Sequence, residues 1–438
     1  MPGPPDERES RVTGPGAQPR WPLPLRLWLA AGGPVSWLLA RLARKAHRRQ
    51  GAPAERLGER FGRPTLPRPA GRLIWLHAAS VGEVVSAAGL VAGLRARTGA
   101  AVLVTTNTAT GAETVARRLP GAVHQFYPLD TPEAVAGFLD HWRPDAALFI
   151  EGDLWPGMVR ALTGRAVPMA LINARASRSR ARFPASFGAL LAPMALVTAQ
   201  EETVREGLIG LGLDPGAVHA PGNLKADIAP PPVDDALRAR IAGAAPDRAV
   251  WAAVSTHPGE EEIVLGAHAR LPGGPLLLLV PRHPGRGEAV AGLIRRAGLR
   301  YTRHSAGERP DAATQVHLID TLGDTGTAYA AAGVALVGGS LVPGIGGHTP
   351  YEPASLGRAV LSGPHLHNFA GAYAGLQAAG AARQVGDGPA LARTVTELLA
   401  DPPALAAMQQ AASAEYARAR GATERTLRLL APLLQDAG

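Results

Sequence analysis

The chain has 438 residues, more than the roughly 250–300 that one hydrophobic core usually serves, so we expect at least two domains. Hydrophobic residues make up 46% and charged residues 18%, a balance that excludes a disordered chain. Cysteine is absent, which excludes a disulfide framework and a thiolate nucleophile or metal ligand.

Most of the net charge of +9 lies near the N-terminus. Residues 1–63 contain 12 Lys and Arg against 5 Asp and Glu, a net charge of +7, and the rest of the chain is close to neutral. A nucleic-acid-binding protein more often spreads basic residues over its folded surface, with aromatic partners. We therefore predict no nucleic-acid partner.

The first 50 residues divide into two segments. Residues 1–20 predict a disordered tail. Residues 21–50 join an apolar run, 21-WPLPLRLWLAAGGPVSWLLA-40, to a basic one, 41-RLARKAHRRQ-50. Arg26 and three prolines disfavour a transmembrane helix, and the order of the segments disfavours a signal peptide. We favour a segment that lies in a membrane face with its cations against anionic lipid; a buried helix with a solvated basic end is the alternative.

From residue 72 onward, strand-like apolar runs alternate with helix-like stretches, which predicts parallel sheets covered by helices on both faces. A proline cluster, 228-IAPPPVDD-235, predicts a linker at 229–235 between an N-terminal domain, 51–228, and a C-terminal domain, 236–438. From residue 388 the chain should be helical apart from an Asp-Pro-Pro break. The expected strands are 72–78, 101–106, 146–151, 168–174 and 195–200, then 249–256, 275–282, 315–320, 333–340 and 359–363.

Chemically active side chains follow the first expected strand, at the sheet edge where doubly wound folds bind ligands. Ser80 lacks the Gly-x-Ser-x-Gly context of a nucleophile elbow, and His77 has no second histidine at metal-ligand spacing, so we assign both to structural roles. Glu83 opens a helix and could be an acid, a base or a helix cap. Glu151 ends another strand, and paired carboxylates suit general-base catalysis in sugar chemistry. Lys225, near the linker, could face a leaving phosphate.

The second domain carries groups suited to an anion. Arg282, His283 and Arg286 follow a buried strand, where they could hold a phosphate, with surface decoration as the alternative. Glu260, Glu261 and Glu262 open a helix, where acids most often compensate the helix dipole.

Two further turns of this domain suit a nucleotide. Gly323, Asp324 and Thr325 form a strand-to-helix turn whose N–H groups could meet a phosphate. The glycine-rich run 337-VGGSLVPGIGGHTPYEPASLGRAV-360 leads into another helix, where Glu352 could accept two ribose hydroxyls. No Gly-Lys-Ser/Thr follows, so this is not a P-loop. A nucleotide or nucleotide sugar is the ligand that fits best.

Taken together, nine motifs resemble, in order, those of the 3-deoxy-D-manno-octulosonic acid (Kdo) transferases of lipopolysaccharide synthesis, glycosyltransferase family 30. The resemblance spans about residues 25–425. The motifs are 77-HAASVGE, 105-TTNTATG, 150-IEGDLWP, 173-NARASRSRARF, 222-GNLK, 255-STHPGEEE, 280-VPRHPGR, 319-IDTLGD and 338-GGSLVPGIGGHTPYEPA.

The resemblance implies a GT-B fold, in which two Rossmann-like domains face a central cleft, and transfer of Kdo from CMP-Kdo to a lipid A precursor at the cytoplasmic face of the inner membrane. It implies that Glu83 is the catalytic base and that Glu151 and Lys225 stabilise the transition state. No cofactor is expected, since CMP-Kdo is a donor substrate. The implied CMP-binding residues are Arg282, His283, Gly323, Asp324, Thr325, Thr349, Pro350, Tyr351 and Glu352.

The chain departs from the family pattern in three motifs, at Gly152-Asp153 and Gly157, at Asp324-Thr325 and at Thr349. Because Glu83, Glu151 and Lys225 are kept, we interpret these changes as tuning, or as a shifted acceptor or donor, and not as loss of activity. CMP carries one phosphate, which cationic side chains and helix N-termini could neutralise, so we predict no metal. Two alternatives stay open: a GT-B transferase that uses another activated sugar, and a non-catalytic membrane-associated scaffold.

Overall fold

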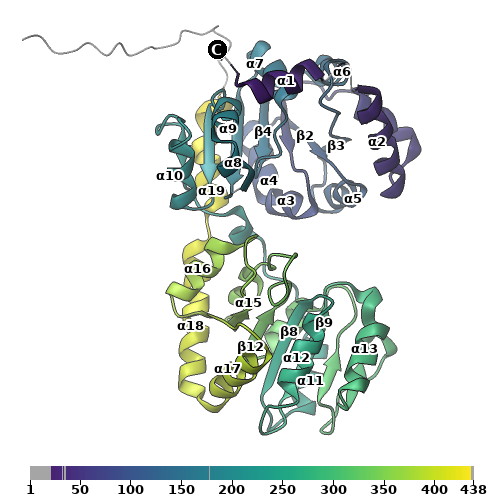
Figure 1. Ribbon diagram of the computed structural model, residues 1–438, viewed down its shortest axis with the longest axis vertical. Helices are drawn as coiled ribbons and strands as arrows, with labels where there is room; N and C mark the ends of the chain where they lie inside the picture. The colour runs from purple at the N-terminus through teal and green to yellow at the C-terminus, as the bar shows by residue number, and fades with distance from the viewer. Residues whose placement is uncertain (1–20, 32, 34–35, 177, 436–438) are drawn as a thin grey trace, which may run out of the picture. The chain divides into compact units, whose positions relative to one another are not determined.

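The structure is a computed structural model that describes residues 21–31, 33, 36–176 and 178–435. The predicted tail at 1–20 lies outside the described residues. The chain forms two compact units (Figure 1). The first contains the described residues up to Gly222 together with those from Thr423 onward, and the second runs from Asn223 to Ala422.

The first unit is built on a seven-stranded sheet in the order β3-β2-β1-β4-β5-β6-β7, with every paired neighbour parallel. Its central strands are fully buried because helices cover both faces. The strands are β1 (Leu73–His77), β2 (Ala101–Thr106), β3 (Val123–Phe126), β4 (Ala146–Ile150), β5 (Met169–Ala174), β6 (Leu196–Ala199) and β7 (Val218–His219).

Helices surround this sheet, and large aromatic side chains such as Trp75, Phe138 and Phe149 fill one of its faces. The helices are α1 (Leu23–Ala31), α2 (Ser36–Arg49), η1 (Ala54–Phe61), α3 (Val81–Ser86), α4 (Ala88–Thr98), α5 (Ala109–Arg118), α6 (Pro132–Trp142), α7 (Pro156–Gly164), α8 (Arg178–Arg182), α9 (Pro184–Leu191), α10 (Glu202–Ile209) and, from the C-terminal end of the chain, α19 (Ala422–Leu434).

The second unit repeats the plan with the order β10-β11-β9-β8-β12-β13-β14, again all parallel. Trp251 and Ala253 of β8 pack into one layer, and Ala252 and Val254 pack into the other, so the sheet is covered on both faces. The strands are β8 (Val250–Thr256), β9 (Leu276–Pro281), β10 (Tyr301–Arg303), β11 (Val316–Leu318), β12 (Val334–Val337), β13 (Ala359–Ser362) and β14 (Ala382–Gln384).

Helices of the second unit follow the same alternation as those of the first. They are η2 (Leu224–Asp227), α11 (Asp235–Ala244), α12 (Glu260–His268), η3 (Pro284–Arg286), α13 (Gly287–Arg296), η4 (His304–Ala306), α14 (Thr325–Ala331), α15 (Tyr351–Ser355), α16 (Ala370–Ala378), α17 (Gly388–Ala400) and α18 (Pro402–Ala419).

Each of the ten expected strands is present, which confirms the predicted α/β class. The sequence did not indicate β3, β7, β10 or β14, which are only two to four residues long. Each is an edge strand of its sheet. Such strands are partly exposed and lack a continuous apolar run, so periodicity does not reveal them.

The predicted linker differs from the observed division of the chain. The first unit already ends at Gly222, and the proline cluster packs within the second unit. A Cβ on Gly326 of α14 would lie 2.1 Å from the carbonyl oxygen of Pro232, so glycine is required there. The Asp234 N–H donates to Thr327 Oγ1 at 2.9 Å. The C-terminal helices also divide: α18 stays with the second unit, and the yellow helix α19 returns to the first (Figure 1).

Helix α1 packs against the first unit instead of extending from it. Trp28 Nε1 donates to Asp130 Oδ2 at 2.7 Å, and the Trp28 ring lies 5.5 Å from the Trp155 ring, centroid to centroid. Asp130 also accepts from the N–H groups of Gly157 and Met158 at 2.9 and 2.8 Å, so one carboxylate joins α1 to the start of α7. Within the described ranges, no helix is both long and apolar enough to cross a bilayer.

Candidate active site

The order of strands places Glu83 and Glu151 at one position of the first sheet. β1 and β4 are hydrogen-bonded neighbours, and the strand order reverses direction between them. Glu83 lies in the turn and helix that follow β1, and Glu151 directly follows β4. Ligands of doubly wound sheets bind at this reversal, beyond the carboxyl ends of the strands.

Glu83 makes the contacts of a helix cap. Ser80 is the N-cap of α3, and its hydroxyl accepts from the Glu83 N–H. In return the Glu83 carboxylate accepts from the Ala79 N–H at 2.8 Å and from Ser80 Oγ at 3.0 Å. This reciprocal pattern is close to a capping box, and it fixes the carboxylate at the sheet edge. Ser80 therefore serves the turn, as the sequence predicted.

The pKa of Glu83 is raised to about 7, chiefly by burial and next by the charge of Glu151; Asp153 adds a smaller effect. Hydrogen bonds from Ala79 and Ser80 work in the opposite direction. A carboxylate with this pKa is a stronger base than an ordinary glutamate and is still ionised in half of the molecules near neutral pH. The capping role therefore does not exclude a catalytic one.

Glu151 adopts a left-handed backbone conformation, with φ of +58°. Non-glycine residues rarely adopt this conformation, and it concentrates at functional sites. The side chain is nearly buried, and Oε2 lies 3.3 Å from Nε of Arg175, which follows β5. Arg180 Nη2 approaches the Glu151 carbonyl oxygen at 3.5 Å. One arginine thus contacts the Glu151 carboxylate, and a second contacts its backbone.

A third carboxylate, Asp153, is held by polar groups from two strand ends. His77 is fully buried; its Nδ1 lies 2.9 Å from Thr105 Oγ1, and its Nε2 lies 3.1 Å from Asp153 Oδ2. Asn107 Nδ2 donates to the same oxygen at 2.7 Å. Burial acts to raise the pKa of Asp153, but these hydrogen bonds lower it below its ordinary value. The contacts of His77 agree with the structural role expected for it, whereas we assigned no role from the sequence to its partner Asp153 or to Asn107.

In the second unit, Glu260 organises the glycine-rich loop across the reversal between β8 and β12. Its fully buried carboxylate accepts from the N–H groups of Gly339, Ser340 and Leu341 at 2.7, 2.9 and 2.8 Å, and from His257 at 2.9 Å. From the sequence we expected Glu260 only to compensate the dipole of its helix, and these contacts to the loop were not predicted. Glu260 ties the start of α12 to the residues that follow β12.

Arg286 is engaged by a second buried acid. Its guanidinium makes two contacts with the Glu261 carboxylate, at 2.6 and 3.2 Å, and Thr256 Oγ1 donates to the same carboxylate at 3.0 Å. The sequence grouped Arg286 with Arg282 and His283 as an anion-binding residue. Because a buried carboxylate holds both of its Nη atoms, Arg286 is part of the scaffold.

Arg282 and His283 directly follow β9. The imidazole rings of His257 and His348 lie at the same edge of the sheet. His257 Nε2 lies 2.8 Å from His348 Nε2, the two rings stack at 5.1 Å, and the His283 ring lies 5.9 Å from that of His257. Burial, with Arg282 next, lowers the pKa of His348 to about 4. The charge of Arg282 also opposes the effect of burial on Glu352, whose pKa is raised. Arg282 therefore carries positive charge at this edge of the sheet, whereas the His348 ring is neutral at pH 7.

The turn at Gly323, Asp324 and Thr325 belongs to the same edge, since β11 is the neighbour of β9. Gly323 has φ of +100°, and Thr321 donates its hydroxyl to Asp324, the N-cap residue of α14. Burial, together with the charge of Glu352, raises the pKa of Tyr329 in α14. Glu352 therefore lies within electrostatic reach of the helix that this turn begins.

The remaining predicted residues surround α15. The Thr349 hydroxyl accepts from the Tyr351 N–H at 3.3 Å, and Pro350 is the N-cap residue of α15. Lys225 lies in η2, and its Nζ is 5.1 Å from the centre of the Phe369 ring. Lys225 belongs to the second unit, whereas Glu83 and Glu151 belong to the first.

Among the described residues, no three His, Asp or Glu side chains are arranged to hold a metal ion. Metal-independence therefore stays a prediction that depends on the cationic groups named above.

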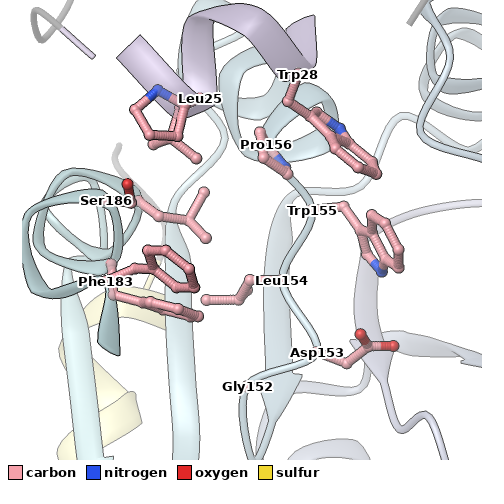
Figure 2. Close-up of a pocket in the computed structure, with 12 residues that line it drawn as sticks. Leu25, Trp28, Gly152, Asp153, Leu154, Trp155, Pro156, Phe183 and Ser186 are labelled. Carbon is pink, nitrogen blue, oxygen red and sulfur yellow. The ribbon is translucent and has the colours of Figure 1, made fainter. Parts of the chain in front are cut away.

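An apolar pocket of about 430 Å³ adjoins the edge of the first sheet at which Glu151 lies. Its walls come from α1, from the loop between β4 and α7, and from α9. Figure 2 shows Trp28 and Trp155 side by side on one wall, with Leu154 and Phe183 across from them and Asp153 at one end. The sequence did not predict this pocket, since its walls come from three separate parts of the chain.

The two parallel Rossmann-like sheets give the chain a GT-B-like fold. A solved glycosyltransferase from Rickettsia africae matches with a TM-score of 0.56, covering 84% of this chain and 100% of that one at 13% identity, which shows the fold alone. The family model for 3-deoxy-D-manno-octulosonic acid transferases (Kdo transferases) matches residues 55–228.

Full-length relatives extend this match over most of the chain. The 3-deoxy-D-manno-octulosonic acid transferase of Bordetella pertussis is 37% identical over 90% of this chain and 95% of its own length. That of Haemophilus influenzae is 35% identical over 87% and 92%. The chain belongs to the Kdo transferase family and is a glycosyltransferase, which confirms the resemblance found in its motifs.

Proposed function

We propose that this protein transfers Kdo from CMP-Kdo to a lipid A precursor with inversion at the anomeric carbon, and that Glu83 is the general base. The observation that carries the proposal is the pair Glu83 and Glu151 at the β1/β4 reversal, in a chain that belongs to the Kdo transferase family. Of the two carboxylates, Glu83 is the one with a pKa near 7, where a base works best at neutral pH.

In the proposed reaction, the Glu83 carboxylate removes the proton from an acceptor hydroxyl. The oxygen then bonds to the anomeric carbon of Kdo on the face opposite CMP. The bond between that carbon and the phosphate oxygen breaks, and CMP leaves with the electron pair. Glu151 stabilises the positive charge that develops on the sugar ring, and Lys225 stabilises the leaving phosphate.

The donor is assigned to the second unit. Arg282 and His283 provide cationic or donor groups for the CMP phosphate, and the turn at Gly323 to Thr325 adds backbone N–H groups. Glu352, in the run from Thr349 through Pro350 and Tyr351, would accept from the ribose hydroxyls. Its position near Arg282 supports this assignment. Thr349 cannot supply an amide, so its contact with CMP would be limited to one hydroxyl.

We also propose that α1 and α2 bind the cytoplasmic face of the inner membrane. Trp37, Leu38 and Leu42 of α2 are 65%, 42% and 55% exposed, which is unusual for large apolar side chains. They lie among the exposed cations Arg41, Arg44, Lys45, Arg48 and Arg49. Apolar and cationic groups on one helix suit an interface with anionic lipid.

The test is transfer by the purified protein from CMP-Kdo to a tetraacylated lipid A precursor, followed by mass spectrometry of the lipid. We expect the mass of Kdo to be added, and Glu83→Gln to lower kcat by about 10²–10⁴-fold. Glu113→Gln, which changes an exposed glutamate of α5, is the matched control and should keep wild-type activity. Turnover with UDP- or GDP-sugars in place of CMP-Kdo would favour the other-donor alternative, and no turnover with any donor would favour the scaffold.

A further inference from the structure

The pocket beneath α1 has no role in the reaction as described so far. We propose that it holds one acyl chain of the acceptor lipid while the hydroxyl of that lipid meets Glu83. This inference deepens the proposed function and rests on it, because it identifies where the apolar part of the acceptor binds.

The lining of the pocket selects an apolar occupant. Of the side chains that line it, four carry polar groups: Asp153, Ser186, Trp28 and Trp155. Three of them are already engaged: Trp28 donates to Asp130, and Asp153 accepts from Trp155, His77 and Asn107. A sugar or nucleotide needs several convergent hydrogen-bonding groups, which this pocket lacks. Its volume of about 430 Å³ lies within the roughly 300–1,000 Å³ typical of small-molecule sites.

The position of the pocket connects it to the carboxylates. Gly152 and Asp153 line it and directly follow Glu151 in the chain. In Figure 2, these residues lie at the end of the pocket away from Leu25 and Ser186. An acyl chain whose methyl end lies near Leu25 and whose carboxyl end lies near Gly152 would therefore place the polar part of its lipid at the sheet edge where Glu83 lies.

The entrance suits a lipid that comes from a membrane. Leu25 of α1 is buried, whereas Leu23 and Leu27 of the same helix are 63% and 59% exposed. Helix α1 thus has apolar groups on both its inner and outer faces. Phe183, which lines the pocket and is 50% exposed, lies 5.4 Å below the guanidinium of Arg182. A cation at the rim is complementary to the phosphates of an anionic lipid.

The contact between Trp28 and Asp130 keeps the wall in place. Because Asp130 also accepts from Gly157 and Met158, α1 is held to the start of α7. A preformed pocket costs less conformational entropy on binding than one that the ligand must assemble.

The experiment fills the pocket and compares two acceptors. Ser186→Trp places an indole in the pocket from α9, and Ala185→Trp places the same group on the exposed neighbouring position as a matched control. Each variant is assayed with the tetraacylated precursor and with its fully deacylated, water-soluble form. We expect Ser186→Trp to raise KM for the acylated acceptor at least about tenfold, since even one methylene that no longer fits an apolar pocket costs roughly 10–200-fold.

The same variant should keep its wild-type rate with the deacylated acceptor, which would also show that it folds and binds CMP-Kdo. Equal kinetics of Ser186→Trp, Ala185→Trp and wild type on the acylated acceptor would overturn the proposal. If Ser186→Trp does not fold, Ser186→Leu should give the same selectivity to a smaller degree.

A second measurement is independent of turnover. A precursor with a diazirine in one acyl chain should cross-link on illumination to residues 24–28 or 183–190, as mapped by mass spectrometry. Cross-links confined to α2 would show that the chain binds only at the membrane face and would overturn the pocket assignment. If wild type transfers Kdo to neither acceptor, the proposed function fails, and the cross-link map still decides whether the pocket holds an acyl chain.

Discussion

Glu83 and Glu151 follow two adjacent parallel strands, β1 and β4, at the point where the strand order of the first sheet reverses. The charge of Glu151 is, after burial, the second cause of the raised pKa of Glu83. The charge of Glu151 thus makes the Glu83 carboxylate more basic, while the charge of Glu151 itself is compensated by Arg175. This electrostatic coupling, together with the proposed role of Glu83 as the base, is the basis of the first two predictions.

The activity should fall as the pH drops through about 7. Glu83 acts as a base only when it is ionised, and its pKa is raised to about 7, so protonation below that pH removes the active form. We expect kcat/KM to decrease tenfold per pH unit on the acid side. A profile that stays flat down to pH 5 would contradict the assignment of Glu83 as the base.

Glu151→Gln should move this acid limb to lower pH. The substitution removes the negative charge that disfavours ionisation of Glu83, but burial remains, so the pKa should fall while staying above the ordinary value for glutamate. The kcat should also fall, because the charge that stabilises the sugar cation is lost. The measurement is the pH dependence of kcat/KM for wild type and variant; Glu113→Gln serves as the control and should leave the limb unchanged.

Glu260→Ala should loosen the glycine-rich loop and weaken CMP binding. The change leaves the N–H groups of Gly339, Ser340 and Leu341 without their acceptor, and we expect a loss of about 3–5 kcal/mol in the free energy of unfolding of the second unit. Amide hydrogen exchange at residues 339–341 should become faster. Glu262→Ala, an exposed position in the same helical turn, should change stability by less than about 0.5 kcal/mol.

Chelation should leave the reaction unaffected. If Arg282, His283 and Lys225 neutralise the single phosphate of CMP, excess EDTA will not change the initial rate. Loss of activity in EDTA that is restored by Mg²⁺ would show that the cationic side chains are insufficient.

Membrane binding should depend on the exposed face of α2. Trp37→Glu combined with Leu42→Glu replaces two exposed apolar side chains by acids, so we expect weaker co-sedimentation with vesicles that contain anionic phosphatidylglycerol. Binding of wild type should weaken with added salt because the basic residues contribute electrostatically. Equal sedimentation of both proteins would refute the role of this face.

The central strands, and the positions of the candidate residues at their ends, could be predicted from the sequence because both depend on local patterns. A buried parallel strand such as β9, Leu276–Pro281, is a continuous apolar run, and ligands of such sheets bind where those runs end. The motifs around Glu83 and Arg282 follow such runs directly. The apolar runs therefore predicted the class of fold. The resemblance of the motifs at their ends indicated the family.

Only the tertiary structure decided which charged residues are occupied by partners distant in the sequence. Arg286 and Glu261 are 25 residues apart and pair with each other, and Glu260 binds N–H groups about 80 residues away. Neither contact leaves a periodic signal, because each depends on how two loops meet at a sheet edge. The same holds for the pocket beneath α1 and for the return of α19 to the first unit. The sequence alone therefore determined the central strands and the types of side chain at their ends, whereas long-range packing decided which of those side chains hold the fold together.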